Sequence, residues 1–258
     1  MTEIKFSIIA NPRTGTNHFI DLLICHQEVT CHREVFHRDT VYLHGGARDD
    51  LLERRERDPV AFLQELYDSS PTRACGFKIF GEHNSAVLDN VLHDPTIKKI
   101  ILYRPNYLAV YSSERIAEAE KNYLIKEDDN KISIDACAYD SSRTSEKAPF
   151  DQTEFNHRWS AYQEHYKYAI DVLNESGQNY LFTTYEDFVN ESLFRRVFTF
   201  LGLSQPVEVN SRVRKQNTSD ILSRFLNPED ALAYIEGIGR INWANEGFML
   251  WGGKDGVF

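Results

Sequence analysis

A loop near the start of the chain has the composition of an anion-binding site. The segment ANPRTGTN (10–17) lies between a short apolar run and a run with helical periodicity. Gly15 lets the backbone approach an anion closely, and the amides of residues 14–17 would point towards it from a helix N-terminus. We therefore predict that a phosphate-like group is bound by Arg13, Thr14, Gly15, Thr16 and Asn17.

This loop differs from the Walker A sequence GxxxxGK[ST]. Gly15 takes the place of the last glycine, but Ala10 replaces the first. Thr16 replaces the lysine, and Asn17 replaces the magnesium-binding Ser or Thr. The backbone cradle is kept while the lysine and the metal-binding hydroxyl are lost, which favours a phosphate or phosphosulfate bound without magnesium. A strand–turn–helix with one glycine is also common in loops that bind no ligand.

Short apolar runs alternate with amphipathic segments along the chain. Strands are predicted at 4–10, 74–80, 98–103 and 180–185, and helices at 18–26, 58–70, 85–94, 106–120, 155–177 and 189–202. This alternation predicts an α/β fold with a P-loop-like parallel sheet flanked by helices on both faces. Ligands of such sheets bind at the carboxyl ends of the strands, directly after residues 10, 80, 103 and 185.

Two of these strand ends carry motifs that resemble the PAPS-dependent sulfotransferases, where PAPS is 3'-phosphoadenosine 5'-phosphosulfate. The family has a 5'-phosphosulfate loop of the form P-[KR]-[ST]-G-[ST] after its first strand, and NPRTGT (11–16) is similar to it. The family also has an R-[DN]-P…S element whose Arg and Ser, eight residues apart, bind the 3'-phosphate. Arg104-Pro105 and Ser112 are similar to this element, in the expected order and distance.

Further segments extend the resemblance over residues 5–220. YLFTTYEDF (180–188) is similar to a family strand whose tyrosine lies against the adenine, here Tyr185, and FTFLGL (198–203) to the helix end that follows. VRKQNT (213–218) is similar to a late basic segment from which a cation reaches the 3'-phosphate. The resemblance therefore implies a PAPS co-substrate and no required metal. It also implies that the nucleotide is bound by Arg104, Ser112, Tyr185, Arg214 and Lys215.

The loop arginine and the strand GFKIF (76–80) resemble the bacterial carbohydrate and lipid sulfotransferases and the tyrosylprotein sulfotransferases. Cytosolic steroid and phenol enzymes instead have a loop lysine and a Lys-Thr-His motif that contains the base. Lys78 is retained here, but Phe80 stands where that histidine would be.

The general base must therefore come from elsewhere. The stretch CHQEVTCHRE (25–34) resembles the H-P-x-V-x-C-x-x-E stretch of the arginine-type enzymes, whose glutamate takes the acceptor's proton, and this implies that Glu34 is the base. A carboxylate near a cationic donor site can stay ionised at neutral pH. The alternative bases are three histidines, His83, His37 and His32.

Sulfuryl transfer resembles phosphoryl transfer in depending on positioning and charge stabilisation. The resemblance implies that Arg13 stabilises the charge that develops on the bridging oxygen. It also implies that Glu34 takes the proton of the acceptor and that Lys78 contacts the transferring group. These three residues are the predicted catalytic set, with a small molecule or carbohydrate as the acceptor.

Composition limits the other functions. The 258 residues carry a formal net charge of −10, which argues against a nucleic-acid partner because phosphate backbones need a broad basic surface. The four cysteines have no metal-binding or disulfide spacing, so we expect free thiols. No signal peptide or membrane span is predicted, and we expect a cytoplasmic protein.

We expect one sulfotransferase domain over residues 1–258, with irregular acceptor-side loops near 37–57 and 125–152. Two other functions remain open. One is a P-loop kinase-like phosphotransferase, against which the missing Walker lysine and magnesium ligand argue. The other is a nucleotide-binding module that has lost its chemistry. The sequence specifies neither the acceptor nor the oligomeric state.

Overall fold

The computed structural model describes residues 2–120, 146–189, 191–205 and 218–246. The described residues fall into two compact units. The sheet unit comes from residues 1–103 and 165–211, and the helical unit from residues 104–164 and 212–258. That the chain acts as one domain stays a prediction.

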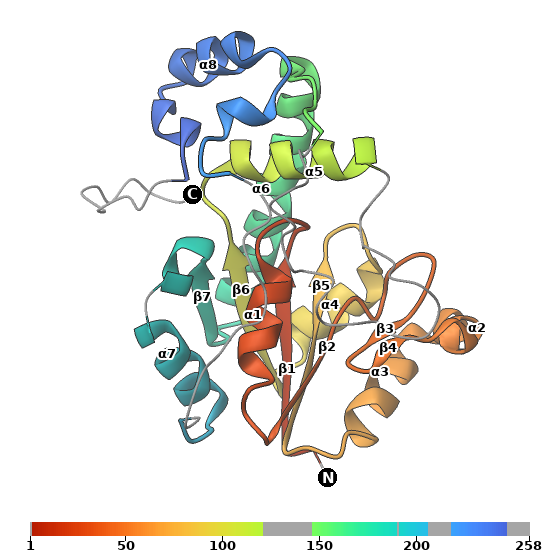
Figure 1. Cartoon of the computed structure of the whole chain (residues 1–258). Helices are drawn as coiled ribbons and strands as arrows, with labels where there is room; N and C mark the ends of the chain where they lie inside the picture. Colours follow the sequence, from red (N-terminus) through yellow and green to blue (C-terminus); the bar gives the residue numbers. More distant parts are fainter. Residues whose placement is uncertain (1, 121–145, 190, 206–217, 247–258) are drawn as a thin grey trace. The chain divides into compact units, whose positions relative to one another are not determined.

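The sheet unit contains a five-stranded sheet in the order β2-β5-β1-β6-β7 (Figure 1). Every adjacent pair in this sheet is parallel. The strands are β1 (Ile4–Ala10), β2 (Val29–His32), β5 (Ala74–Phe80), β6 (Ile97–Tyr103) and β7 (Tyr180–Thr184). The predicted parallel α/β sheet is confirmed, and four of its five strands lie where the sequence places them.

Helices cover both faces of this sheet. On one face, the apolar sides of α1 (Thr16–Leu23) and α7 (Glu191–Leu201) pack in one buried cluster with Phe6, Ile8 and Ala10 of β1. Strand side chains alternate between faces, so Phe77, paired with Ser7, points to the opposite face. There it contacts the ring of Tyr67 from α3 (Pro59–Asp68), at a centroid distance of 6.3 Å.

Two helices of the sheet unit begin with a side-chain cap. The Asp58 side chain accepts a hydrogen bond from the amide of Ala61 at 3.0 Å, and Pro59 occupies the first turn. Asn84 caps α4 (Ser85–His93) in the same way, accepting from the amide of Val87 at 3.0 Å. An Asx side chain at this position satisfies an amide that has no partner inside the helix.

The stretch at 37–57, expected to be irregular, forms local structure. It contains a hairpin of β3 (Tyr42–Leu43) and β4 (Gly46–Ala47), the 3-10 turn η1 (Asp49–Leu51) and the helix α2 (Leu52–Arg57). The buried Arg55 guanidinium donates from Nη1 to the carbonyls of Val35, His37 and Thr40. A charged side chain thus acts as an internal brace, which a polar sequence pattern does not reveal. Residues 125–145, most of the second stretch (125–152), lie outside the described residues.

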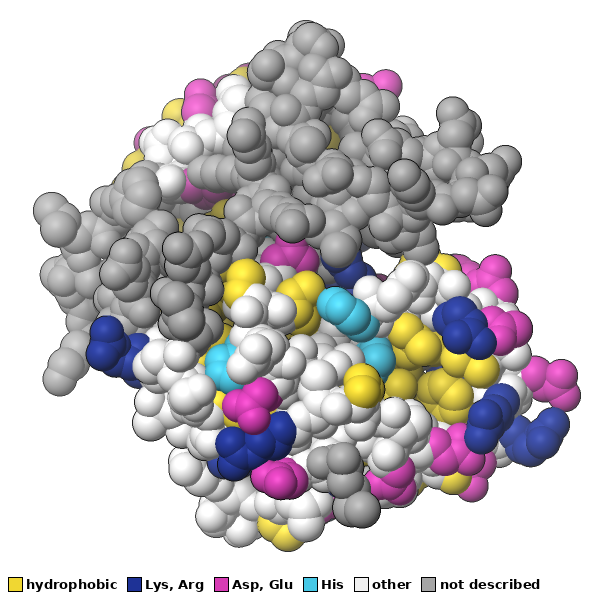
Figure 2. All heavy atoms as spheres, turned by 60° about the horizontal axis from the view of Figure 1, so that its bottom comes forward, with side chains coloured by type: hydrophobic (Ala, Val, Ile, Leu, Met, Phe, Trp, Pro, Cys, Tyr) yellow, Lys and Arg dark blue, Asp and Glu magenta, His cyan; other side chains and the backbone are white. Residues whose placement is uncertain are grey.

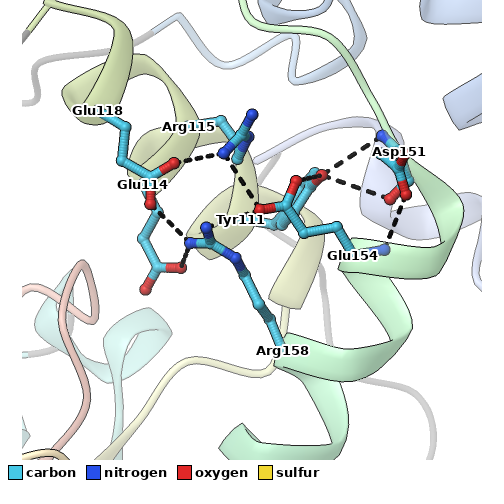
Figure 3. Close-up of polar contacts among 7 residues, drawn as sticks. All are labelled: Tyr111, Glu114, Arg115, Glu118, Asp151, Glu154 and Arg158. Carbon is cyan, nitrogen blue, oxygen red and sulfur yellow. Dashed lines mark hydrogen bonds and ion pairs between the residues drawn. The ribbon is translucent and has the colours of Figure 1, made fainter.

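The helical unit contains α5 (Tyr107–Glu120), α8 (Pro228–Gly237), η4 (Leu222–Arg224), η5 (Ile241–Ala244) and the first part of α6 (Gln152–Glu175). An ion-pair cluster joins α5 to α6 (Figure 3). Arg158 Nη2 contacts Glu154 at 2.7 Å, and its Nη1 contacts Glu118 at 2.8 Å and Glu114 at 3.6 Å. Arg115 contacts Glu154 at 3.2 Å. These ion pairs connect α5 to the first part of α6.

The described residues contain no helix that is long and apolar enough to cross a membrane. Cys25, Cys31 and Cys75 are free thiols, and Cys137 lies outside the described residues. On the face drawn in Figure 2, lysine and arginine side chains are interspersed with aspartate and glutamate.

Candidate active site

The predicted anion loop connects β1 to α1 in the sheet unit. Gly15 has φ +87° and immediately precedes α1, so its left-handed backbone turns the chain into the helix. The hydroxyl of Thr14 donates to the Asn11 carbonyl at 2.7 Å and closes the turn. Because this proton is used inside the loop, Thr14 would serve an anion in this conformation through its backbone amide.

Arg13 has an unusual backbone conformation. Its φ of +60° is the only positive value among the non-glycine residues that the structure describes. A side chain in this region costs of order 1–3 kcal/mol, and such strain collects at functional sites. The position of Arg13 in the loop is thus consistent with a role that the fold alone does not require.

Lys78 of β5 is buried beside the start of α1. Its side chain is 2% exposed, and its ammonium lies 2.9 Å from Glu34 Oε1. The same ammonium donates to Asn17 Oδ1 at 2.9 Å and to Thr16 Oγ1 at 3.4 Å. Lys78 therefore links the predicted base to the anion loop, and three predicted site residues surround it.

Glu34 reaches Lys78 because of an edge strand that the sequence analysis missed. β2 pairs with β5 through Cys31 opposite Gly76 and His32 opposite Phe77. Glu34 follows two residues after the end of β2, and the Lys78 amide donates to the Arg33 carbonyl at 3.3 Å. The predicted base thus sits at the carboxyl end of a parallel strand, where such folds place their ligands.

The charges of this pair depend on one another. Burial disfavours the ionised form of Glu34, but Lys78 and then His83 outweigh it and hold the pKa of the carboxyl well below its usual range. Burial lowers the pKa of Lys78 from its ordinary value, and Glu34 opposes that shift. Glu34 is therefore ionised at neutral pH, in the form that can accept a proton.

His83 is oriented towards the same carboxylate. Its Nδ1 accepts a hydrogen bond from the Phe80 amide at 3.3 Å, which leaves the ring proton on Nε2 when the imidazole is neutral. Nε2 lies 3.8 Å from Glu34 Oε2. In this orientation His83 has no lone pair to offer an acceptor's proton, so the geometry suits it to orienting Glu34.

In the other two alternative bases, the Nδ1 atom also accepts a hydrogen bond from a backbone amide. His32 Nδ1 accepts from the His44 amide at 3.1 Å, and burial, with a smaller effect of His44, lowers the pKa of His32 to about 4. His37 Nδ1 accepts from the Asp39 amide at 3.2 Å.

His165 of α6 belongs to this site and was not identified from the sequence. Its ring lies against Gly81, where a Cβ would come within 2.7 Å of its Nδ1. Burial lowers its pKa to about 4, opposed by a hydrogen bond with the Ala10 backbone and helped by His83. Within the described part of the chain, its Nε2 is buried without a hydrogen-bond partner. Helical spacing could have identified His165 as a buried residue, because it lies three residues after the buried Tyr162.

The neighbouring Tyr166 fastens α6 to the same edge of the sheet. Its hydroxyl accepts from the Asn11 amide at 3.1 Å and donates to the Leu102 carbonyl at 2.7 Å.

Tyr185, predicted to face the adenine, is the half-buried first residue of η3 (Tyr185–Val189), directly after β7. That role stays a prediction. Arg214 and Lys215 lie outside the described residues.

The predicted 3'-phosphate residues meet inside the helical unit. Arg104 and Ser112 are both buried, and both lie beside a second buried arginine, Arg224 of η4. Arg224 Nη1 donates to Ser112 Oγ at 3.1 Å. Both guanidinium groups contact the same oxygen, Glu246 Oε1, and the Arg224 contact is 3.1 Å long. Two guanidinium groups and one carboxylate thus meet in this buried cluster.

Arg224 and Glu246 were not identified from the sequence. Backbone pairing brings them together: the Glu246 amide donates to the Ser219 carbonyl at 2.7 Å, and the Ile221 amide donates to the Ala244 carbonyl at 2.9 Å. Neither residue belongs to a motif with fixed spacing from Arg104, so only the fold reveals the cluster.

Comparisons with known proteins agree with this architecture. No family model and no curated protein matches the sequence. A crystal structure of a sulfotransferase from Alicyclobacillus acidocaldarius is similar, with a TM-score of 0.50 and 16% identity over 94% of this chain and 95% of that chain. A retinol dehydratase in complex with retinol and PAP has a TM-score of 0.46 and 14% identity, over 98% of this chain and 84% of the other.

A mouse sulfotransferase, SULT7A1, complexed with PAP is a further match, with a TM-score of 0.41 and 11% identity over 93% of this chain and 66% of the other. The similarity to the Alicyclobacillus enzyme extends over nearly the full length of both chains. Together with the five-stranded parallel sheet, it shows that this chain has the sulfotransferase fold.

Proposed function

We propose that the protein transfers a sulfuryl group from PAPS to a hydroxyl or amine of a small molecule or carbohydrate, releasing 3'-phosphoadenosine 5'-phosphate (PAP). The observation that carries the proposal is the contact of Lys78 with both Glu34 and the start of the anion loop. Within a sulfotransferase fold, this contact joins a candidate base to a candidate phosphosulfate cradle.

Binding of the donor's 5' side would fall to the loop at residues 11–17. The amides at the start of α1 and the Arg13 guanidinium are the donors suited to a phosphosulfate, and the macrodipole of α1 adds a favourable partial charge. On the 3' side, Arg104 and Arg224 supply two cations for one phosphate, with the Ser112 hydroxyl beside them.

The chemical step would be an in-line displacement at sulfur. The acceptor's oxygen or nitrogen forms a bond to sulfur, and the bond from sulfur to the bridging oxygen of the 5'-phosphate breaks. The electron pair of that bond stays on PAP, where Arg13 and the loop amides stabilise the charge that develops. The acceptor's proton passes to Glu34.

The lowered pKa of Glu34 makes the timing of proton transfer important. A weakly basic carboxylate does not deprotonate a free alcohol, but bonding to sulfur makes the acceptor's proton strongly acidic. Glu34 would therefore take the proton late in the step, after bonding to sulfur has begun. His83 would hold the carboxylate in place during this transfer.

The proposal is tested by thermal unfolding with PAP, ATP and ATP with magnesium. PAP should raise the melting temperature strongly and without magnesium, whereas ATP should have little effect because it lacks a 3'-phosphate. Arg104→Ala should abolish this difference, since it removes a charge-assisted contact worth about 1.5–3 kcal/mol.

Catalysis is tested separately by incubation with PAPS and a panel of acceptors, with mass spectrometry for an added sulfuryl group. Equal stabilisation by PAP and ATP in the unmutated protein would contradict the nucleotide assignment, and magnesium-dependent stabilisation by ATP alone would favour the kinase-like alternative. Binding of PAP with no transfer to any acceptor, and no release of sulfate from PAPS, would instead indicate a binding module without chemistry.

A further inference from the structure

Two consecutive residues of α6 bind the peptide group at which the anion loop begins. The Tyr166 hydroxyl accepts a hydrogen bond from the Asn11 amide at 3.1 Å. His165 forms a hydrogen bond with the Ala10 backbone that opposes the fall in the pKa of the imidazole. A bond that favours the protonated ring is donated by the ring, so its acceptor is the Ala10 carbonyl. This carbonyl and the Asn11 amide belong to one peptide group, which α6 therefore binds at both ends.

The two ring nitrogens of His165 are used unequally. Nε2 is buried and has no hydrogen-bond partner in the described part of the chain, so the proton donated to Ala10 is on Nδ1. With a pKa of about 4, the ring is neutral at pH 7 and its lone pair is on Nε2. A buried acceptor without a partner lowers stability, and an apolar side chain would avoid that cost. The imidazole therefore indicates a role for the Nδ1 donor beyond packing.

The same ring packs against the turn that carries His83. A Cβ at residue 81 would lie 2.7 Å from His165 Nδ1, so Gly81 leaves room that a larger residue would fill. Two residues later, the His83 amide donates to the Phe80 carbonyl at 3.1 Å, and the Phe80 amide donates to His83 Nδ1 at 3.3 Å. This closed turn holds His83 Nε2 at 3.8 Å from Glu34 Oε2. His165 thus packs on the turn that supports the proposed base.

His165 therefore lies where two neighbouring strands end. Ala10 and Phe80, the last residues of β1 and β5, are paired in the sheet. The anion loop leaves the first strand, and the turn of His83 leaves the second. In the proposed reaction the loop holds the donor and the turn supports Glu34, so their relative position sets the distance between sulfur and base. A misplacement of about 1 Å can lower the rate of such a reaction about 100-fold.

We propose that His165 is a positioning residue of the sulfuryl transfer, which fixes the anion loop relative to the turn of His83 and thereby places Glu34 against the donor. This inference rests on the proposed function and adds a residue to it. His165 acts through the two segments that it contacts, and the proton of the acceptor still passes to Glu34. The atom that carries the role is Nδ1, because it is the one that binds the Ala10 carbonyl.

Three substitutions separate the Nδ1 donor from the bulk of the ring. His165→Asn places an amide nitrogen near the position of Nδ1, His165→Gln places one near that of Nε2, and His165→Leu keeps bulk without a donor. Turnover is measured as transfer from PAPS to an acceptor of the panel, or as release of sulfate with water as the acceptor. It should stay within about three-fold in His165→Asn and fall roughly 10- to 100-fold in the other two variants. PAP affinity, measured by calorimetry, should fall much less, because Tyr166 still binds the Asn11 amide. The matched control, His157→Asn at an exposed position of α6, should change neither quantity.

A double-mutant comparison distinguishes positioning from a merely structural role. If His165 acts by placing Glu34, His165→Leu should lower turnover by a much smaller factor in Glu34→Gln than in the unmutated protein. Equal factors in the two backgrounds would overturn the proposal, and so would equal turnover of His165→Asn and His165→Gln. Thermal unfolding checks that each variant folds, and His165→Gln replaces His165→Leu in the comparison if the latter does not. An unmutated protein that neither transfers the sulfuryl group nor releases sulfate would overturn the proposed function itself, an outcome distinct from any difference between variants.

Discussion

The contact of Glu34 with Lys78 allows stability and catalysis to be separated by one substitution. Glu34→Gln keeps the shape of the side chain and removes its charge. The Lys78 ammonium, 2% exposed, then loses the carboxylate at 2.9 Å and keeps Asn17 and Thr16 as neutral partners. We expect the variant to be less stable and catalytically impaired, for two independent reasons.

The stability loss follows from the burial of the pair. Removal of one partner of a buried ion pair costs about 3–5 kcal/mol. Glu34 is 26% exposed and Lys78 keeps two neutral acceptors, so we expect roughly 2–3 kcal/mol at pH 7. For a chain of this size, each kcal/mol lowers the melting temperature by about 2–4 °C, which predicts a fall of roughly 4–12 °C. Glu82→Gln, on the exposed turn after β5, is the matched control.

The pH dependence has a definite sign. The folded pKa of Glu34 lies below its ordinary value of 4.5, so its contribution to stability is complete above that pH and is lost as the pH falls further, towards the folded pKa. The melting temperatures of the unmutated protein and Glu34→Gln should therefore differ at pH 7 and converge below about pH 4.5.

Turnover provides the second readout. Loss of the proton acceptor should lower it roughly 100- to 10,000-fold at unchanged PAP affinity. In Glu34→Gln/Lys78→Met, no buried charge is left unpaired, so part of the stability should return while turnover stays low. Equal stability of Glu34→Gln and the unmutated protein at pH 7 would refute the electrostatic reasoning. Near-normal turnover would refute the assignment of the base, and a collapse in His83→Ala would then transfer it to that histidine.

Two further predictions concern the neighbours of this pair. Arg13→Ala should lower turnover on the order of 100-fold or more with a smaller loss of PAP affinity, because its contact strengthens as charge develops on the leaving group; if affinity alone fell in a kinetic and binding comparison, Arg13 would be a binding residue only. Gly81→Ala should cost about 1–3 kcal/mol in a denaturant titration, because the new Cβ would lie 2.7 Å from His165 Nδ1. That cost should shrink in the background of His165→Ala, and an equal cost in both backgrounds would show that the strain lies elsewhere.

Long periodic segments were predictable from the sequence because each carries its own signal. β1 and β5 have the predicted bounds, and the helix predicted at 58–70 is α3, which begins at Pro59 after the Asp58 cap. These elements depend on side chains that are close in sequence. The order of the strands in the sheet was not predicted, since parallel pairing joins residues about 70 positions apart, as in Ile4 opposite Ala74.

β2 could not be predicted for the opposite reason. The four residues VTCH give too short a pattern, and polar residues alternate with apolar ones as at many loop positions. The strand exists because β5 offers it an edge, so its signal lies in the tertiary structure. The same holds for Arg224 and Glu246, which become neighbours only when residues 219–221 pair with 244–246.

The missed strand places Glu34, the proposed base, beside Lys78 in a site where Phe80 replaces the histidine of other family members. The Lys78 ammonium is buried, and the carboxylate from the end of β2 supplies its counter-charge at 2.9 Å. The register of β2 against β5 therefore matters for the position of the proposed base, because a slip of one residue would turn the side chains of β2 to the other face. Glu34 and Lys78 thus form one unit: the lysine keeps the carboxylate ionised, and the carboxylate allows the lysine to be buried beside the anion loop.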